Sequence, residues 1–224
     1  MRLLILRPEP GASETAGRAR AMGLEPVVAP LFAITGVAGP PVEAMRYDAV
    51  LLTSANGARH APAGLTALPC FAVGESTAAA ARAAGFAEIR TGPSDGAAAA
   101  AMMAGAGIER ALHPCGRDHL EVEAPGVEIE RRIVYAAEPV AHELFEGPAV
   151  AMLHSARAAA RFAELAGDKG AIAVAAISEA AAAAAGEGWA AKAVAPAPRD
   201  QALLELAAKL CNHAPDVVRD GDGL

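Results

Sequence analysis

The sequence repeats itself at a long period, and this repetition constrains the possible folds more than any other feature. Two segments that begin with Ser-Ala, Ser54–His60 and Ser155–Arg161, start 101 residues apart. The aromatic residues Phe86 and Trp189 follow them at an offset of 103. A duplication with nearly constant spacing predicts two similar lobes, with a ligand bound between them. The matched loops of the two copies are therefore the first place to look for function.

Short apolar runs alternate with alanine-rich stretches along the chain. This alternation is typical of an α/β fold in which helices cover a mainly parallel sheet, and alanine is the strongest helix former. We therefore expect two similar, doubly wound parallel-sheet lobes. The predicted strands are Leu3–Leu6, Pro26–Val28, Ala49–Leu52, Cys70–Val73, Glu88–Arg90, Ala111–His113, Val127–Ile129, Val150–Leu153, Ile172–Ala175 and Lys192–Val194. The predicted helices are Ser13–Met22, Ser76–Ala84, Asp95–Ala104, Ala156–Ala166, Glu179–Ala185 and Asp200–Leu210.

Two extended, β-prone segments interrupt this alternation, Pro30–Val37 and Arg131–Pro139. They predict a pair of linker strands that cross between the lobes. On this interpretation the chain starts one lobe, builds the whole of the second, and returns to complete the first. The predicted boundaries are 1–33 with 140–212 for lobe 1, 38–130 for the inserted lobe 2, 34–37 and 131–139 for the linker strands, and 213–224 for a flexible tail.

The composition argues against several classes of function. A net charge of −7 gives no basic field for nucleic acid. No apolar run approaches the roughly 20 residues of a membrane span, and the apolar start Met1–Arg7 is too short for a signal peptide. Three widely spaced cysteines predict reduced thiols in the cytoplasm. The segment His113–His119 holds three possible metal ligands, but its spacing matches no standard site, so we expect no metal.

Small and hydroxyl-bearing residues follow several of the predicted strands. In a parallel sheet, ligands bind beyond the carboxyl ends of the strands, where the first N–H groups of the next helices can bind carboxylates or phosphates. The serines could equally serve only as helix caps. The candidates at these turns are Ser54, Asn56, Gly74, Ser76, Thr77 and Ser155.

Two further residues carry chemistry that these turns lack. Arg7 ends the first strand, and its guanidinium matches both oxygens of a carboxylate, although a solvated charge would explain it equally well. Tyr135 lies on the second linker strand. Its phenol could donate a proton to a departing hydroxyl, or it could simply pack against the linker.

In their order and spacing, these motifs resemble the uroporphyrinogen-III synthase family over nearly the whole chain. One departure is the turn at Ser178, which continues Glu-Ala where many members have glycine, proline and threonine, so we expect no anion site there. The matching motifs are Leu6-Arg7-Pro8, Asp48–Asn56, Val73–Ala78, Pro114–Arg117, Val134-Tyr135 and the strand that leads into Ser155-Ala-Arg157.

The resemblance implies a two-lobed enzyme of tetrapyrrole biosynthesis that uses no metal and no cofactor. It would cyclise linear hydroxymethylbilane, with loss of water and inversion of ring D, to uroporphyrinogen III. We expect a cytoplasmic monomer with no nucleic-acid or membrane partner. The implied catalytic residue is Tyr135, which would assist departure of the substrate hydroxyl. The implied substrate-binding residues are Arg7, Ser54, Asn56, Gly74, Ser76, Thr77, Gly116 and Ser155.

Two alternatives stay open. A non-catalytic, two-lobed protein that binds or senses a small anion would fit the same duplication, and it would not need Tyr135. A nucleotide-dependent enzyme fits less well. The chain has neither Gly-x-Gly-x-x-Gly after a strand nor a Gly-x-x-x-x-Gly-Lys-Ser/Thr loop.

Overall fold

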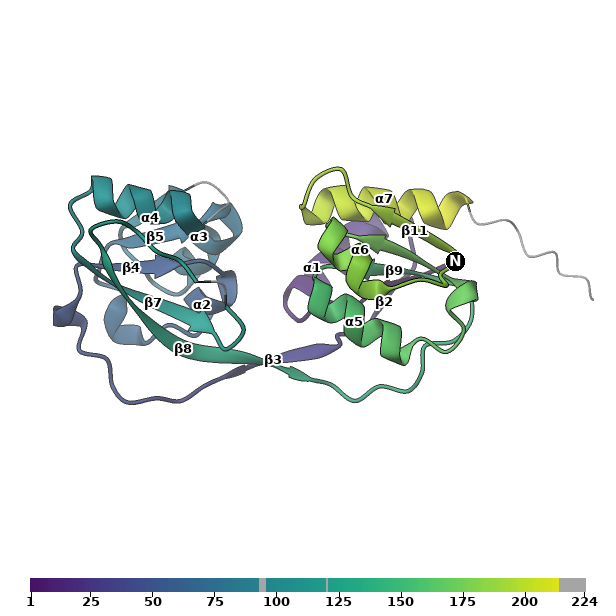
Figure 1. Cartoon of the computed structure of the whole chain (residues 1–224), viewed down its shortest axis with the longest axis horizontal. Helices are drawn as coiled ribbons and strands as arrows, with labels where there is room; N and C mark the ends of the chain where they lie inside the picture. Colours follow the sequence, from purple (N-terminus) through teal and green to yellow (C-terminus); the bar gives the residue numbers. More distant parts are fainter. Residues whose placement is uncertain (93–95, 120, 214–224) are drawn as a thin grey trace, which may run out of the picture. The chain divides into compact units, whose positions relative to one another are not determined.

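The computed structural model describes residues 1–92, 96–119 and 121–213, in which helices and strands alternate (Figure 1). The α-helices are α1 (Gly11–Ala21), α2 (Ala55–Arg59), α3 (Gly74–Ala83), α4 (Gly96–Gly105), α5 (Ala156–Leu165), α6 (Glu179–Ala185) and α7 (Asp200–His213). The strands are β1 (Arg2–Ile5), β2 (Pro26–Val28), β3 (Phe32–Gly36), β4 (Ala49–Leu52), β5 (Cys70–Val73), β6 (Ile89–Gly92), β7 (Arg110–Gly116), β8 (Glu128–Pro139), β9 (Ala149–Leu153), β10 (Ile172–Ala176) and β11 (Ala191–Val194). Short 3₁₀ helices occupy Ala44–Arg46, Ala63–Leu65 and Lys169–Ala171.

The chain divides into two compact units, each with its own sheet. Unit 1 consists of Met1–Ala33 together with the segment from Pro139 onward. Unit 2 is the contiguous segment Ile34–Glu138. Both boundaries fall within the strands β3 and β8, which are hydrogen-bonded neighbours in one sheet.

Strands β3 and β8 pair in antiparallel orientation. The amide of Val37 donates to the carbonyl of Val134 (2.8 Å). Beyond the strand ends, the amide of Val140 donates to the carbonyl of Leu31 (2.9 Å). Residue numbers thus rise along one strand as they fall along the other. The segment expected to be a separate linker strand, 131–139, is continuous with the start of β8, because no glycine or proline interrupts it before its last residue.

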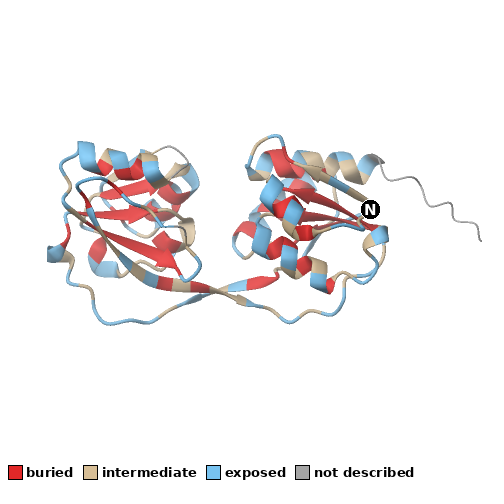
Figure 2. Cartoon of the chain, viewed as in Figure 1, coloured by how far each residue is buried: buried red, intermediate tan, exposed pale blue. Residues whose placement is uncertain are grey.

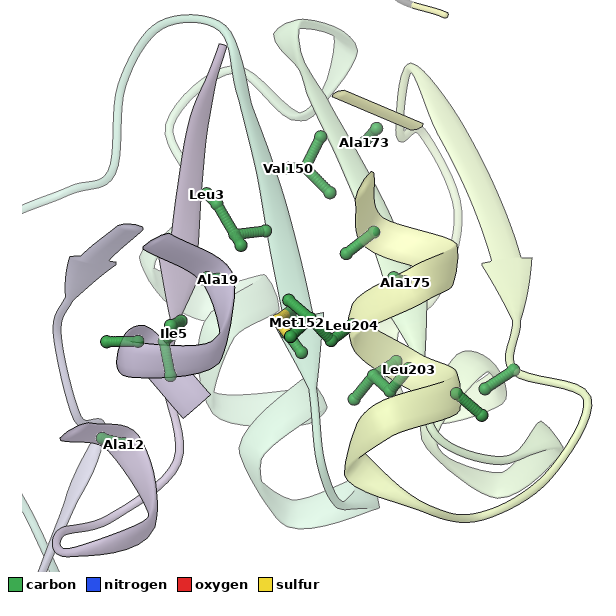
Figure 3. Close-up of a cluster of buried hydrophobic side chains, with 14 residues drawn as sticks. Leu3, Ile5, Ala12, Ala19, Val150, Met152, Ala173, Ala175, Leu203 and Leu204 are labelled. Atoms are coloured by element: carbon green, nitrogen blue, oxygen red, sulfur yellow. The ribbon is translucent and has the colours of Figure 1, made fainter. Parts of the chain in front are cut away.

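Unit 1 contains a five-stranded parallel sheet in the order β11-β10-β9-β1-β2. Strands β9 and β10 are apolar and buried at every residue, as expected of strands covered on both faces. Val150 and Met152 face the side that α1 and α7 cover, where they join Leu203 and Leu204 in one cluster (Figure 3). The alternate residues of β9, such as Ala151, face the opposite side. Helices α5 and α6 pack there against each other and against β9 and β10.

Unit 2 contains a six-stranded sheet in the order β3-β8-β7-β4-β5-β6, in which β4 to β8 run parallel. Helices α2 and α3 cover the face to which Val50 and Leu52 belong. Helix α4 covers the other face, which includes Leu51 and Phe71. In both units the central strands are buried and the helices expose their outer sides (Figure 2).

The five strands of unit 1 have the same spatial order as five of the six strands of unit 2, if β9 is matched to β4. The order β11-β10-β9-β1-β2 then corresponds strand by strand to β6-β5-β4-β7-β8, and helices α5, α6 and α7 correspond to α2, α3 and α4. This correspondence places Ser54 and Ser155 at equivalent positions, directly before α2 and α5. The repeat in the sequence is therefore also a repeat in topology, in which the N-terminal strands β1 and β2 complete the second copy.

A few element ends differ from the sequence predictions. The five-residue helix α2 is too short to show a helical repeat and was not expected, and β7 runs on to Gly116. Helix α7 continues to His213. The flexible tail was expected to begin at residue 213, and this is wrong for His213, which ends α7. The rest of the expected tail, 214–224, and the helix start expected at Asp95 lie outside the described residues. No helix in the described part of the chain is both long and apolar enough to cross a membrane.

Candidate functional site

Each sheet has a point at which the connections leave toward opposite faces. In unit 2 this switch point lies between β4, which leads to α2, and β7, whose following segment packs Ala124 and Val127 on the α4 side. In unit 1 it lies between β9, which leads to α5, and β1, which leads to α1. Ligands of doubly wound sheets bind at the carboxyl ends of the strands at such points. Polar side chains gather at both.

A β-bulge positions Tyr135 at the switch point of unit 2. Cys115 pairs with Ile133, but the next residue of β7, Gly116, pairs with Tyr135, so Val134 is an extra residue. Because side chains alternate along a strand, this single insertion moves Tyr135 to the face on which Gly116 lies.

Gly116 provides the room that the tyrosine ring needs. A β-carbon on Gly116 would lie 2.6 Å from Cζ and 2.9 Å from Oη of Tyr135, far closer than van der Waals contact. The ring of His60 stacks on the other side, with centroids 6.0 Å apart and planes 28° apart. The half-buried phenol is thus confined between a glycine backbone and an imidazole.

The hydroxyl of Ser54 connects Tyr135 to the start of α2. Ser54 is the N-cap of this helix, and its Oγ accepts a hydrogen bond from the amide of Gly57 at 3.0 Å. The same Oγ lies 3.1 Å from Oη of Tyr135. Gly57 lets the helix start lie against β7, because a β-carbon there would be 2.6 Å from the carbonyl oxygen of Pro114.

A buried histidine lies on the opposite face of the same strand ends. Nε2 of His113 is 2.9 Å from Oγ1 of Thr53, while Nδ1 of this fully buried ring has no hydrogen-bond partner. Burial, with smaller contributions from the charges of His119 and Arg131, lowers the pKa of His113 to about 4. The imidazole is therefore neutral at physiological pH. His119 approaches it edge-on and bonds the carbonyl of Gly116 through Nδ1 (2.9 Å).

The switch point of unit 1 carries a charged cluster around Asp200, the first residue of α7. Arg7 (2.9 Å), Thr15 (2.8 Å) and His154 (2.8 Å) share Oδ1, and Arg18 (2.6 Å) binds Oδ2. Burial alone would raise the pKa of Asp200, but the hydrogen bonds from His154, Arg18 and Thr15 outweigh it and hold this pKa well below its ordinary range. The carboxylate stays ionised in the folded protein.

The sequence did not point to this cluster. Asp200 was expected only as a helix start, and its partners lie up to 193 residues away in the chain. Burial lowers the pKa of His154 although Asp200 favours its protonated form. Because Arg7 already pairs with a carboxylate inside its own unit, any substrate group that it binds must share the guanidinium with Asp200.

The remaining candidates have varied surroundings. Ser155 caps α5 by accepting from the amide of Ala158 at 3.1 Å. Asn56 accepts through Oδ1 from the guanidinium of Arg59 at 2.9 Å. In these contacts both side chains act as acceptors. The hydroxyl proton of Ser155 therefore stays available for donation.

The turn before α3 differs from expectation. Ser76 does not cap this helix, because α3 already begins at Gly74 with Val73 as its N-cap residue. Gly74 has a positive φ of 73°, a conformation that glycine adopts without strain, so the backbone alone accounts for a glycine at this position. Thr77, with 5% of its surface exposed, lies in the first turn of α3. Among the described residues no three metal-ligating side chains come together.

The fold and these strand-end groups define a doubly wound α/β protein whose polar chemistry rests on hydroxyls, a phenol and a shielded carboxylate. The family model described as uroporphyrinogen-III synthase HemD matches residues 13–205. The chain belongs to this family, whose members are cyclising lyases of haem biosynthesis.

Solved structures show the same fold at low sequence identity. Uroporphyrinogen-III synthetase from Helicobacter pylori is 14% identical, with a TM-score of 0.66 over 93% of this chain and 98% of that one. A mutant uroporphyrinogen III synthase from Thermus thermophilus is 16% identical, with a TM-score of 0.50 over 96% of this chain and 100% of that one. No curated protein sequence matches the chain significantly.

Proposed function

We propose that this protein is a uroporphyrinogen-III synthase in which Tyr135 assists the first chemical step. The observation that carries the proposal is the phenol of Tyr135 on β8, held beside Ser54 at the carboxyl ends of β4 and β7, in a chain that the family model matches over most of its length. A phenol is neutral before the reaction and acidic enough to protonate a leaving hydroxyl. A protein that only binds an anion needs no proton donor for a leaving group.

In the proposed reaction Tyr135 supplies the proton that the leaving hydroxyl needs and recovers a proton at the end. The C–O bond of the substrate hydroxymethyl group breaks, and its electron pair leaves with the oxygen. This oxygen takes the proton of Tyr135 and departs as water, which leaves an azafulvenium cation and a phenolate. Attack by the substituted carbon of ring D gives a spiro intermediate, and its fragmentation and reclosure invert the ring. The ring carbon that forms the last bond loses its proton, which restores the phenol.

Binding of the substrate carboxylates falls to groups that leave N–H or O–H donors available. We propose this role for the first residues of α2, α3 and α5 with the turns before them, for the end of β7 and for Arg7. The residues in question are Ser54, Asn56, Gly74, Ser76, Thr77, Gly116 and Ser155. Their main task is to hold the two ends of the substrate so that the spiro path is faster than direct closure, which is catalysis by proximity.

The finer parts of the proposal concern organisation and setting. We take units 1 and 2 as the two similar lobes of the enzyme, joined through β3 and β8. The protein would act as a monomer in the cytoplasm, without metal or cofactor and without nucleic acid. The thiols of Cys70 and Cys115 are buried and unpaired, as in proteins kept in a reducing compartment.

The experiment supplies freshly generated hydroxymethylbilane, oxidises the products and separates isomers I and III by chromatography. The parent protein should give isomer III, whereas closure without enzyme gives isomer I. Tyr135→Phe should lower turnover by about 100-fold or more, the usual contribution of a general acid. The matched control is Tyr47→Phe, since the chain has only these two tyrosines and Tyr47 belongs to the core of unit 2.

Two results would contradict the proposal. If the parent gave only isomer I at the level of the buffer control, the synthase activity itself would be absent. If Tyr135→Phe kept full turnover, the synthase would stand but Tyr135 would have no part in its chemistry.

A further inference from the structure

We infer that Ser54 is a positioning residue that stabilises the phenolate of Tyr135 as the substrate hydroxyl departs. The inference rests on the proposed function. Ser54 then has a task beyond capping α2, and this task, rather than contact with a substrate carboxylate, uses its proton. The evidence is the arrangement of hydrogen bonds around its Oγ.

The hydrogen-bonding capacity of Ser54 Oγ fits this task. A serine hydroxyl has one proton and two acceptor positions. The amide of Gly57 uses one acceptor position at 3.0 Å, and Tyr135 Oη lies at 3.1 Å. The second acceptor position and the proton therefore both remain for the phenol. Ser54 can accept from Tyr135 while the phenol is neutral and donate to it once the phenol has lost its proton.

This reversal makes the interaction stronger in the transition state than in the resting enzyme. A hydrogen bond to a charged oxygen is roughly twice as strong as one between neutral groups. Interactions that strengthen only as charge develops raise kcat and leave substrate binding largely unchanged. Ser54 supplies the phenol's hydrogen bond among the residues that the structure describes, so no other described group takes over this task.

The surroundings fix the phenol where Ser54 can reach it. Gly116 and His60 confine the ring from two sides, and the bulge at Val134 sets its face. Serine and tyrosine come from strand ends 81 residues apart in the chain, so the hydrogen bond depends on the register of β8. Ser54 itself is fixed by its cap on a helix that lies against β7.

The first test is Ser54→Ala in the assay for isomer III. We expect kcat to fall about 10- to 100-fold, with KM within about twofold of the parent value. Ser54→Thr keeps the hydroxyl and should recover most of the lost turnover. The control is Ser178→Ala, which removes an equivalent cap, Ser178 Oγ to the amide of Ala181 at 3.3 Å, at a position without a phenol. It should lower stability to a similar extent and leave kcat unchanged.

The second test separates action through Tyr135 from a general structural role. In a Tyr135→Phe background, the further change Ser54→Ala should lower kcat by less than about threefold, because the hydroxyl it acts on has gone. A full-sized effect in that background would overturn the inference and leave the synthase function intact. If the parent protein made only isomer I, the proposed function would fail instead.

A third variant decides the question if Tyr135→Phe is too slow to measure. Ser54→Asp keeps a side-chain acceptor for the Gly57 amide and so keeps the cap, but an ionised carboxylate has no proton to donate. We expect normal stability and a kcat as low as that of Ser54→Ala. Recovery of kcat in Ser54→Asp would show that the cap alone matters and would overturn the inference.

Discussion

The two switch points use different chemistry to keep polar groups in place. In unit 2 the hydrogen bonds of Tyr135 with Ser54 and of His113 with Thr53 join neutral groups. In unit 1 the carboxylate of Asp200 is balanced by two arginines. Neutral hydroxyls can exchange partners with a substrate at little cost, whereas breaking a partly buried ion pair leaves an unpaired charge. This contrast favours unit 2 as the place where protons move.

The buried histidine predicts how stability depends on pH. The pKa of His113 is about 4 in the folded protein and about 6.5 in an unfolded chain. As pH falls from about 6.5 to about 4, the unfolded chain takes up a proton that the folded protein excludes. The free energy of unfolding should therefore decrease over this range, by at most about 3 kcal/mol from this residue.

The measurement is urea unfolding at several pH values between about 7.5 and 4.5, in the parent and in His113→Gln. The variant keeps a polar atom near Thr53 but has no ionisable ring, so its stability should change less steeply with pH. Some slope should remain, because burial also lowers the pKa of His154. His119→Gln, which keeps the buried ring, should behave like the parent. Equal slopes in the parent and in His113→Gln would contradict this account.

Alanine lets the helices of both units lie close against their sheets. In α6 the side chains of Ala181, Ala182 and Ala185 are buried, while Ala183 on the outer side is exposed. A helix that presents only methyl groups has little room for larger side chains at its inner surface. The alanine runs of the sequence are therefore packing surfaces.

This packing predicts different effects of one substitution at two positions of α6. Ala181→Leu would force extra volume into a filled interface and should destabilise the protein by about 1–3 kcal/mol. Ala183→Leu adds the same side chain on the exposed side and should change stability by less than about 0.5 kcal/mol. The comparison requires the urea midpoint of both variants. Similar midpoints would show that the inner face of α6 is loosely packed.

The elements could be predicted from the sequence where local signals decide them. Apolar runs gave β4 and β5 with the ends that the structure shows, and Ser54 and Ser155 are caps as their type and position suggest. Ser76 shows the limit of this reasoning. A glycine with positive φ at Gly74 lets α3 begin two residues earlier, so the serine falls inside the helix.

Contacts between distant strands could not be predicted in this way. Nothing near Tyr135 in the sequence signals the bulge at Val134, because the insertion is visible only against the partner strand β7. The family resemblance pointed to Tyr135 without explaining how it is held. The cluster around Asp200 could not be predicted for the same reason. Its partners come from α1 and from the segments directly after β1 and β9, and they meet only in the folded protein.

At the scale of the whole molecule, the two units differ in how the chain builds them. Unit 2 is one contiguous segment with apolar clusters on both faces of its sheet. Unit 1 needs two distant segments, because β1 comes from the N-terminus and lies inside the sheet between β9 and β2. Without β1 and β2 the remaining sheet loses the backbone hydrogen bonds between β1 and β9 and exposes apolar surface at its new edge.

This difference predicts that unit 2 folds alone and that the C-terminal part of unit 1 does not. A fragment of residues 31–140, which keeps the pairing of β3 with β8, should unfold in a single cooperative transition in urea and give well-dispersed amide signals by NMR. A fragment of residues 141–213 lacks β1 and β2, and with β1 it lacks the side chains of Leu3 and Ile5, which complete the cluster formed by β9 and α7. It should show neither property until a peptide covering residues 1–31 is added. Cooperative folding of 141–213 without that peptide would mean that β9, β10 and β11 form a stable sheet with α5, α6 and α7, and that β1 is dispensable for the core of unit 1.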